Sequence, residues 1–118
     1  MRISVETIPH AAQRYETCGD WIFNGDELIV FVSTLGDSNM EFLVALHEII
    51  EAMVCDKAGI AEHDVSRFDI DHPELDDPGG DRRAPYHRQH VFAENIERMV
   101  AQELGVDWNA YTRRVESL

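Results

Sequence analysis

The chain has few basic residues: 10 Lys and Arg stand against 23 Asp and Glu, which gives a formal net charge of −13 over 118 residues. Such a surplus of negative charge repels phosphate backbones and anionic lipid headgroups. We therefore expect the protein to bind neither nucleic acid nor membranes. The same charge attracts cations and basic proteins, although its simplest consequence is solubility.

Long apolar segments and paired cysteines are also absent. No apolar run approaches the roughly 18 residues that span a bilayer, and the N-terminal MRISVETIPH lacks the apolar core of a signal peptide. We therefore expect a cytoplasmic protein. Cys18 and Cys55 form no CxxC pair, so neither a disulfide nor thiol chemistry is expected. The length and the 44% hydrophobic content predict a single domain over residues 1–118.

The N-terminal third predicts a small antiparallel sheet. Residues 2–8 alternate between apolar and polar side chains and end at Pro9, as in a half-buried strand. Residues 21–23 and 26–32 flank Asn24-Gly25, a dipeptide that favours the type I′ turn of a β-hairpin. The second arm includes the continuous apolar run LIVFV. This run is typical of a central strand covered on both faces, or covered by helices on one face and by a partner on the other. The second alternative hints at a homodimer.

Two long helices are predicted downstream. The first covers about residues 39–58, with Ser38 and Glu41 as its capping box. Its apolar residues cover one wide face and comprise Phe42, Leu43, Leu46, Ile49, Ile50, Met53 and Val54. The second runs from Pro85 to about Leu104. A short helix over 62–68, a mobile Asp-, Pro- and Gly-rich loop, and a last short helix after residue 107 complete the chain. We therefore predict an α+β fold in which the small sheet packs on two long helices.

The first long helix carries the pentapeptide HEIIE, residues 47–51. His47 and Glu51 lie one helical turn apart, at the edge of the apolar face, where they should be partly buried. Imidazole and carboxylate are both zinc ligands, so the spacing predicts that this pair binds one divalent ion. Glu48 points away from the pair. The alternative for His47 and Glu51 is a hydrogen bond or ion pair at the helix edge.

The second long helix begins with a similar cluster. His87 and His90 are three residues apart, and Glu94 follows His90 by four, so all three side chains share one face of that helix. Packing of the two apolar faces would bring this cluster to His47 and Glu51. We predict that at least one of the three completes the metal site, with His90 the first choice because it lies closest to the apolar border. The alternative is a polar helix face. His72, on the intervening loop, is a further candidate.

The order of these features resembles that of the zincin-like metallopeptidases. The resemblance covers about residues 21–104 and rests on strand 28–34, the HEIIE helix, and His87, His90 or Glu94 downstream. It implies a zincin-like fold in which His47 is the first metal ligand and Glu48 the general base. Glu51 replaces the second histidine of the HExxH motif, and a carboxylate there admits manganese or iron as well as zinc. HEIIEAM, PYHRQH and GVDW together also resemble segments of small bacterial and phage proteins, a likeness that assigns no activity.

These features together predict a metal-binding protein, with zinc the first choice of ion, that could hydrolyse a peptide or amide bond in a peptide or protein substrate. In that reaction the ion lowers the pKa of a water molecule and Glu48 accepts its proton. The alternative is a non-enzymatic acidic adaptor or inhibitor, which would bind a basic protein through its helices and an exposed sheet edge.

Overall fold

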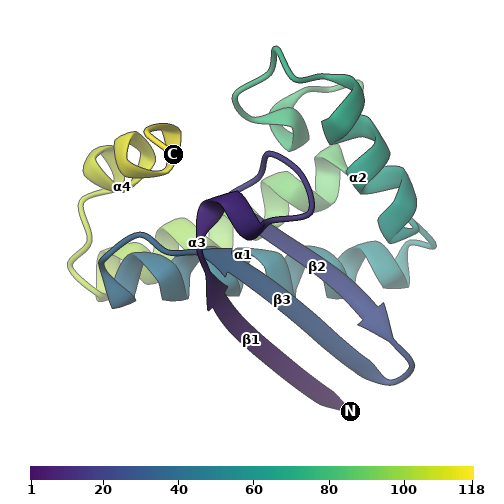
Figure 1. The fold of residues 1–118 in the computed structure, drawn as a ribbon, viewed down its shortest axis with the longest axis horizontal. Helices are drawn as coiled ribbons and strands as arrows, with labels where there is room; N and C mark the ends of the chain where they lie inside the picture. The colour runs from purple at the N-terminus through teal and green to yellow at the C-terminus, as the bar shows by residue number, and fades with distance from the viewer.

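A computed structural model describes all residues, 1–118. The strands are β1 (Arg2–Ile8), β2 (Gly19–Asn24) and β3 (Glu27–Ser33), and the helices are α1 (Ser38–Lys57), α2 (Glu62–Asp71), α3 (His87–Glu103) and α4 (Trp108–Glu116). Two short 3-10 helices, η1 (His10–Ala12) and η2 (Pro78–Gly80), lie in the connections. Figure 1 shows the sheet in front of α1 and α3, with α2 and α4 on opposite sides of the molecule. The fold is therefore α+β, as predicted.

The sheet is mixed, so the prediction of an antiparallel sheet was wrong for one strand pair. The strand order is β1-β3-β2, in which β2 is antiparallel to β3 and β1 is parallel to it. Successive strands still alternate in direction along the chain. However, β3 is inserted between the other two, so β1 and β3 become neighbours that run the same way. The most apolar strand thereby takes the central position, where both its edges are hydrogen-bonded.

The β2–β3 hairpin turns one residue later than predicted. Its strands end at Asn24 and resume at Glu27, so Gly25 and Asp26 are the central turn residues. Gly25 has φ +64°, and no residue other than glycine has positive φ. One positive φ at the first central residue is the pattern of a type II′ turn, whereas type I′ needs two. Glycine is the residue that adopts this conformation without strain.

Helix α1 begins at Ser38 and is capped by the preceding residue. The side chain of Asp37 accepts hydrogen bonds from the backbone N–H groups of Asn39 and Met40. Glu41 reaches back to accept from Leu35 N at 2.7 Å. The predicted capping box therefore lies one residue out of register, because the aspartate, rather than the serine, takes the cap position.

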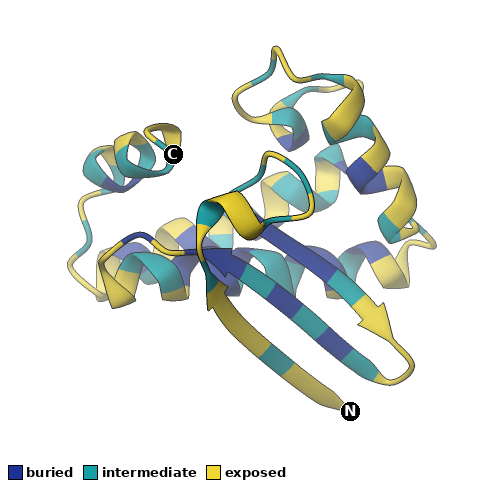
Figure 2. Ribbon diagram, in the orientation of Figure 1, coloured by how far each residue is buried: buried dark blue, intermediate teal, exposed yellow.

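Helix α1 packs between the sheet and α3, and its buried face differs from the predicted one. Leu28, Val30 and Val32 of β3 are fully buried on the helix side of the sheet. The buried residues of α1 are Leu43, Val44, Ala45, His47, Glu51, Ala52 and Cys55. Phe42 and Met53, predicted to face inward, are 51% and 38% exposed. Figure 2 shows the buried segments of α1 and α3 behind the sheet. The helix thus turns two ionisable side chains inward, although the apolar pattern placed them at its edge.

The remaining elements differ from the sequence predictions mainly in their ends. Helix α2 extends to Asp71, three residues beyond the predicted end, and α3 begins at His87 rather than at Pro85. No helix of the structure has both the length and the apolar character needed to cross a bilayer.

Candidate metal centre

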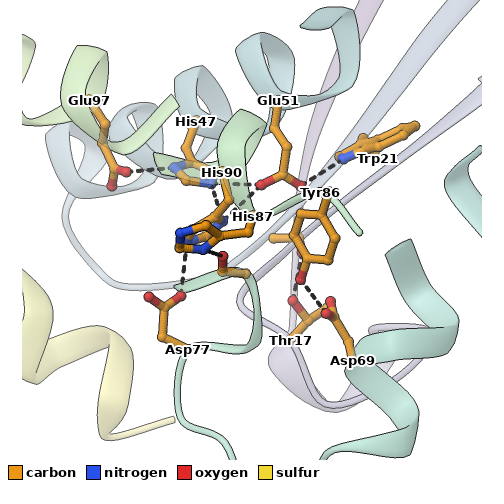
Figure 3. A network of polar contacts seen from close by, with 12 residues as sticks. Thr17, Trp21, His47, Glu51, Asp69, Asp77, Tyr86, His87, His90 and Glu97 are labelled. Carbon is orange, nitrogen blue, oxygen red and sulfur yellow. Dashed lines mark hydrogen bonds and ion pairs between the residues drawn. The ribbon is translucent and has the colours of Figure 1, made fainter. Parts of the chain in front are cut away.

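Three side chains from α1 and α3 meet at one point and form the His47–Glu51–His90 triad. Nε2 of His47 lies 3.1 Å from Oε2 of Glu51 and 3.1 Å from Nδ1 of His90. Nδ1 of His90 lies 2.9 Å from the same Glu51 oxygen. Figure 3 shows the three groups converging between the two helices. His47 and Glu51 are buried, at 7% and 4% exposure, and His90 is partly buried. This group could hold a metal ion.

Helical spacing and helix packing together build the triad. His47 and Glu51 are four residues apart, so their side chains are neighbours on the face of α1 that meets α3. His90 lies in the first turn of α3, close to the point where the chain enters that helix. Because α1 packs closely against α3, residues 43 positions apart in sequence reach the same point.

Both histidines are oriented by a carboxylate on their outer nitrogen. Nδ1 of His47 lies 2.8 Å from Oε1 of Glu97, and Nε2 of His90 lies 2.9 Å from Oδ1 of Asp77. The hydroxyl of Tyr111 donates to the other oxygen of Glu97 at 2.5 Å. An ionised carboxylate only accepts hydrogen bonds, so the outer nitrogen of each ring is the protonated one. In the neutral rings, the two inner nitrogens therefore turn lone pairs toward each other.

Two further contacts fix the remaining parts of the triad. The indole Nε1 of Trp21 donates to Oε1 of Glu51 at 3.1 Å, which leaves Oε2 free for the two histidines. Gly79 of η2 packs against the rings of His90 and Tyr86 so closely that a Cβ at this position would overlap both. Glycine is therefore required there to allow the close approach.

The pKa values of the triad are set by two opposing effects, burial and hydrogen bonding. Burial favours neutral His47, but its hydrogen bonds with Glu51 and Glu97 outweigh burial and raise its pKa well above the ordinary value. Burial acts likewise on His90, and its bonds with Asp77 and Glu51 raise its pKa to about 10. Burial would raise the pKa of Glu51, whereas the two histidines lower it to about 2. Without a metal ion, protons therefore supply the positive charge among the three atoms.

The triad opens into a cavity of about 770 Å³. Its wall is formed by residues of β2, all four α-helices and the loop that contains η2. The lining includes eleven Asp and Glu and four His but no Lys or Arg. The field inside this cavity therefore favours a cation.

Glu48 lines the same cavity from α1. Unlike the carboxylates of Glu51 and Glu97, its carboxylate has no hydrogen-bond partner in the protein. Gly19 lies beside it, and a Cβ on that glycine would come within 2.7 Å of the Glu48 side chain. Burial and the negative charge of Glu51 raise the pKa of Glu48 well above its ordinary value. A carboxylate in this setting readily takes up a proton.

A second polar cluster lies beside the triad on the cavity wall. The hydroxyls of Tyr86 and Tyr15 each donate to one oxygen of Asp69, the second at 2.9 Å. Burial raises the pKa of Asp69 to about 6, although these two hydrogen bonds act in the opposite direction. The ring of Tyr86 also meets that of His90 edge to face, with the ring centroids 6.0 Å apart. The cluster links α2, the start of α3 and the segment before β2 around the cavity.

Three other residues named from the sequence lie outside the triad. Nδ1 of His87 is 3.0 Å from the carbonyl oxygen of Gly79, so this histidine supports η2. Glu94 lines the cavity but does not belong to the triad. Nδ1 of His72 is 2.8 Å from the carbonyl oxygen of Phe68 at the end of α2.

The carboxylates behind the histidines were not identified from the sequence. Glu97 follows His90 by seven residues, or two helical turns, so the spacing did contain a signal for a shared face. Asp77 lies on the Asp-rich loop, where several acidic residues stand close together and no periodicity distinguishes one from another. Trp21 lies in the first arm of the predicted hairpin, and nothing in the sequence indicated that its indole N–H would bond Glu51.

Comparisons with known proteins identify no relative. No family model matches the chain, and searches of curated proteins and of solved structures found no significantly similar protein. The structure establishes a small α+β fold with a buried His/Glu/His group that could hold a metal ion.

Proposed function

We propose that the protein binds a divalent metal ion through Nε2 of His47, Oε2 of Glu51 and Nδ1 of His90, and that it is a zincin-like, metal-dependent hydrolase of peptide or amide bonds. One observation carries the proposal: two imidazole nitrogens and a carboxylate oxygen converge within 3.1 Å of one another. Such a convergence needs positive charge among the three atoms, which protons supply in the metal-free protein and a divalent ion would supply in their place. Glu97 and Asp77 hold the two rings in this orientation. Carboxylates hydrogen-bonded to metal-binding histidines commonly have this role.

The donor set fits a catalytic ion. Two histidines and one carboxylate are a common zinc ligand set in hydrolases, and the same set binds iron and manganese. Tetrahedral coordination at about 2.0–2.1 Å separates ligand atoms by roughly 3.3–3.4 Å. The observed separations of 2.9–3.1 Å require only a small expansion. We favour zinc as the ion, with manganese and iron as alternatives.

The surrounding residues would divide the chemical work. A divalent ion at the triad supplies Lewis acidity, which lowers the pKa of a water molecule and polarises a substrate carbonyl. Glu48, without a partner on the cavity wall, would accept a proton from the attacking water and pass it to the leaving amine. Trp21 holds Glu51 so that only one of its oxygens faces the centre. The cavity accommodates the substrate segment around the scissile bond.

Metal content is the first test. Protein purified without a chelator or a metal-affinity tag should contain about one ion per chain by mass spectrometry, and dialysis against a chelator should remove it. His90→Ala should abolish uptake of added zinc or manganese. His63→Ala is the matched control, because His63 is exposed on α2 and outside the triad. Less than about 0.2 ions per chain in the wild type, with no uptake of either metal, would refute the site.

Hydrolysis is tested separately from metal binding. We expect the metal-loaded protein to cleave members of a fluorescence-quenched peptide library, and Glu48→Gln to reduce the rate by at least about 100-fold while metal content stays unchanged. A Glu48→Gln variant that cleaves at the wild-type rate would refute the role of Glu48. A metal-loaded wild type that cleaves no peptide would leave a metal-binding protein without this activity.

The second candidate function is a non-enzymatic acidic adaptor that binds a basic protein. It rests on the net charge of −13 alone. Binding of a basic protein by an adaptor would be unchanged by Glu48→Gln and by removal of metal. The Glu48→Gln variant and the metal-free protein therefore separate the two proposals.

A further inference from the structure

Strand β1 forms an open edge of the sheet. It pairs with β3 along its whole length on one side and with nothing on the other. The backbone N–H of Arg2 donates to Asp26 O, and Ile8 O accepts from Thr34 N, so the even-numbered residues direct their polar groups toward β3. The odd-numbered residues Ile3, Val5 and Thr7 therefore direct theirs outward. β1 has no lysine, proline or bulge, the features that usually protect an edge from pairing.

Apolar side chains surround this edge. Ile3 and Val5 lie on the helix side of the sheet, beside Leu28 and Val30, yet they are 44% and 49% exposed because no helix covers β1. Next to them runs a groove of about 360 Å³ between β1 and α1. Its helix wall belongs to an apolar stripe on α1, which comprises Phe42, Leu46, Ile49 and Met53. These residues follow the i, i+4, i+7, i+11 spacing of a helix that packs against a neighbour.

We propose that a second copy of this chain pairs with the β1 edge, so that β1 and the partner's β1 run antiparallel and the two sheets join into one of six strands. Only registers that pair odd-numbered residues with odd-numbered residues bring the outward N–H and C=O groups together. One such register is centred on Ser4. It places Ile3 opposite Val5 of the partner subunit, and these two residues exchange both backbone hydrogen bonds.

The charges on β1 select this register. When Ser4 faces its own copy, Arg2 lies opposite Glu6 of the partner subunit on the other face of the sheet, and the two-fold axis repeats the pair. Opposite charges directly across an antiparallel pair are stabilising, and like charges are destabilising. Shifting the register by two residues would instead place Arg2 opposite Ile8. Arg2 and Glu6 are the only charged residues of β1, and both are exposed. The edge is therefore complementary to itself.

The symmetry of this pairing also accounts for the apolar groove. A two-fold axis at Ser4 is perpendicular to the sheet, so both α1 helices lie on the same face of the joined sheet. The groove lies on the β1 side of α1 and so faces the axis in both subunits. Ile3, Val5, Phe42 and Met53 are exposed in one chain and Leu46 and Ile49 are partly buried, and the pairing would cover these residues together. A partner of different sequence would have no reason to match both the register and the charges.

Oligomeric state and charge reversal test the proposal. Light scattering on the full chain should give twice the chain mass of 13.5 kDa. Glu6→Arg should raise the dimer dissociation constant by about tenfold or more, because two repulsive Arg–Arg contacts replace two attractive ones. Exchanging the charges in Arg2→Glu/Glu6→Arg should restore the wild-type constant. Glu103→Arg, an exposed reversal at the end of α3, is the control and should leave it unchanged. Circular dichroism checks that each variant is folded.

A cross-link locates the axis independently of charge. Ser4→Cys should form a disulfide-linked dimer under mild oxidation, because the two copies of residue 4 face each other at a distance a disulfide can span. Thr7→Cys, three residues from the axis, should not cross-link to its own copy. A monomer at every attainable concentration would overturn the proposal. A dimer that is insensitive to Glu6→Arg and does not cross-link at Ser4→Cys would also overturn it, because that dimer would use another surface.

Discussion

The two faces of α1 differ in an unusual way: the buried face includes two ionisable residues among its apolar ones, and the opposite face exposes large apolar side chains. The buried face holds His47 and Glu51, which meet His90 of α3, whereas Phe42 and Met53 lie on the far side with much of their surface exposed. Burying ionisable groups costs free energy unless each is paired. Exposing large apolar side chains gives up the stabilisation that burial would supply. The hydrogen bonds of His47 and Glu51 offset the first cost, and the exposure of Phe42 and Met53 is one of the observations behind the proposed dimer.

The two faces differ in how many of their side chains find a partner within one chain. On the inner face every member of the triad has a partner behind it: Glu97, Asp77 or Trp21. On the outer face Ile49 still packs against the core, whereas Phe42 and Met53 are exposed at the two ends of the stripe. In the proposed metal-bound dimer, a cation would complete the inner face and a second chain would cover the outer face. Mutations on the two faces should therefore be detected by different measurements.

The largest effect is expected when the inner face loses its central residue. His47→Ala would leave the carboxylates of Glu51 and Glu97 buried without their shared partner, and removing one member of a buried charge network costs about 3–5 kcal/mol. Urea unfolding of the metal-free protein, followed by circular dichroism, should report that loss in the free energy of unfolding. A loss below about 1 kcal/mol would mean that the triad is not held together as described.

The next largest effect is expected from pH. The contributions of His90 and Glu51 to stability depend on pH in opposite directions. The pKa of His90 is raised from 6.5 to about 10, so its contribution to stability is complete below pH 6.5 and is lost as the pH rises toward 10. The pKa of Glu51 is lowered from 4.5 to about 2, so its contribution is complete above pH 4.5 and is lost as the pH falls toward 2. The metal-free protein should therefore be most stable between about pH 4.5 and 6.5.

Metal binding should reverse the alkaline trend. An ion at the triad replaces the protons on both histidines, so its affinity increases as the pH rises above 6.5. The difference in melting temperature between the zinc-loaded and the metal-free protein should grow from pH 6 to pH 8, as measured by calorimetry. A metal-free protein that becomes more stable over this range would contradict the assigned pairing of His90.

The sequence predicted the inner face better than the outer one for a physical reason. Ligand spacing is local: His47 and Glu51 are adjacent on any α-helix, and His90 was chosen because it lies closest to the apolar border of the next long helix. Which face of α1 is buried depends on the elements that pack against the helix. The apolar periodicity of the helix alone does not determine it. Phe42 and Met53 fit the apolar pattern, but the side of α1 that is buried carries Leu43, Val44, Ala52 and Cys55 together with His47 and Glu51.

Strand order was equally beyond a local prediction. Each strand was located within about two residues, since alternation and the Asn-Gly pair are local signals. Whether β3 pairs with β1 as well as with β2 depends on the path of the segment between residues 9 and 18, which carries no pattern. β1 stands at the end of the strand order, and this position leaves its other edge free.

Asp77 gives a smaller and more selective change at the inner face. Asp77→Asn keeps the shape of the side chain but removes the charge that fixes the ring of His90, and such outer-shell changes reduce metal affinity by about 10–100-fold. Because Asp77 is exposed, we expect a value near the low end. Competition with a fluorescent zinc chelator would measure it. The control is Asp76→Asn, the exposed neighbour that makes no contact with His90. Equal affinities for the two variants would show that Asp77 does not orient the ring.

The smallest effect is expected when a residue of the outer face is replaced. Phe42→Ala should change the free energy of unfolding of the single chain by less than about 1 kcal/mol, because half of that side chain is already in water. Its neighbour Leu43 is fully buried, and Leu43→Ala should cost about 2–5 kcal/mol in the same urea titration. Both are compared in a Glu6→Arg background, at a concentration at which light scattering shows that variant to be monomeric. In the wild-type background Phe42→Ala should instead weaken the dimer. Replacement of Leu43 would then affect unfolding of the chain, and replacement of Phe42 would affect dissociation of the dimer. If Phe42→Ala were as costly as Leu43→Ala in the monomer, the two faces of α1 would not differ as the structure indicates.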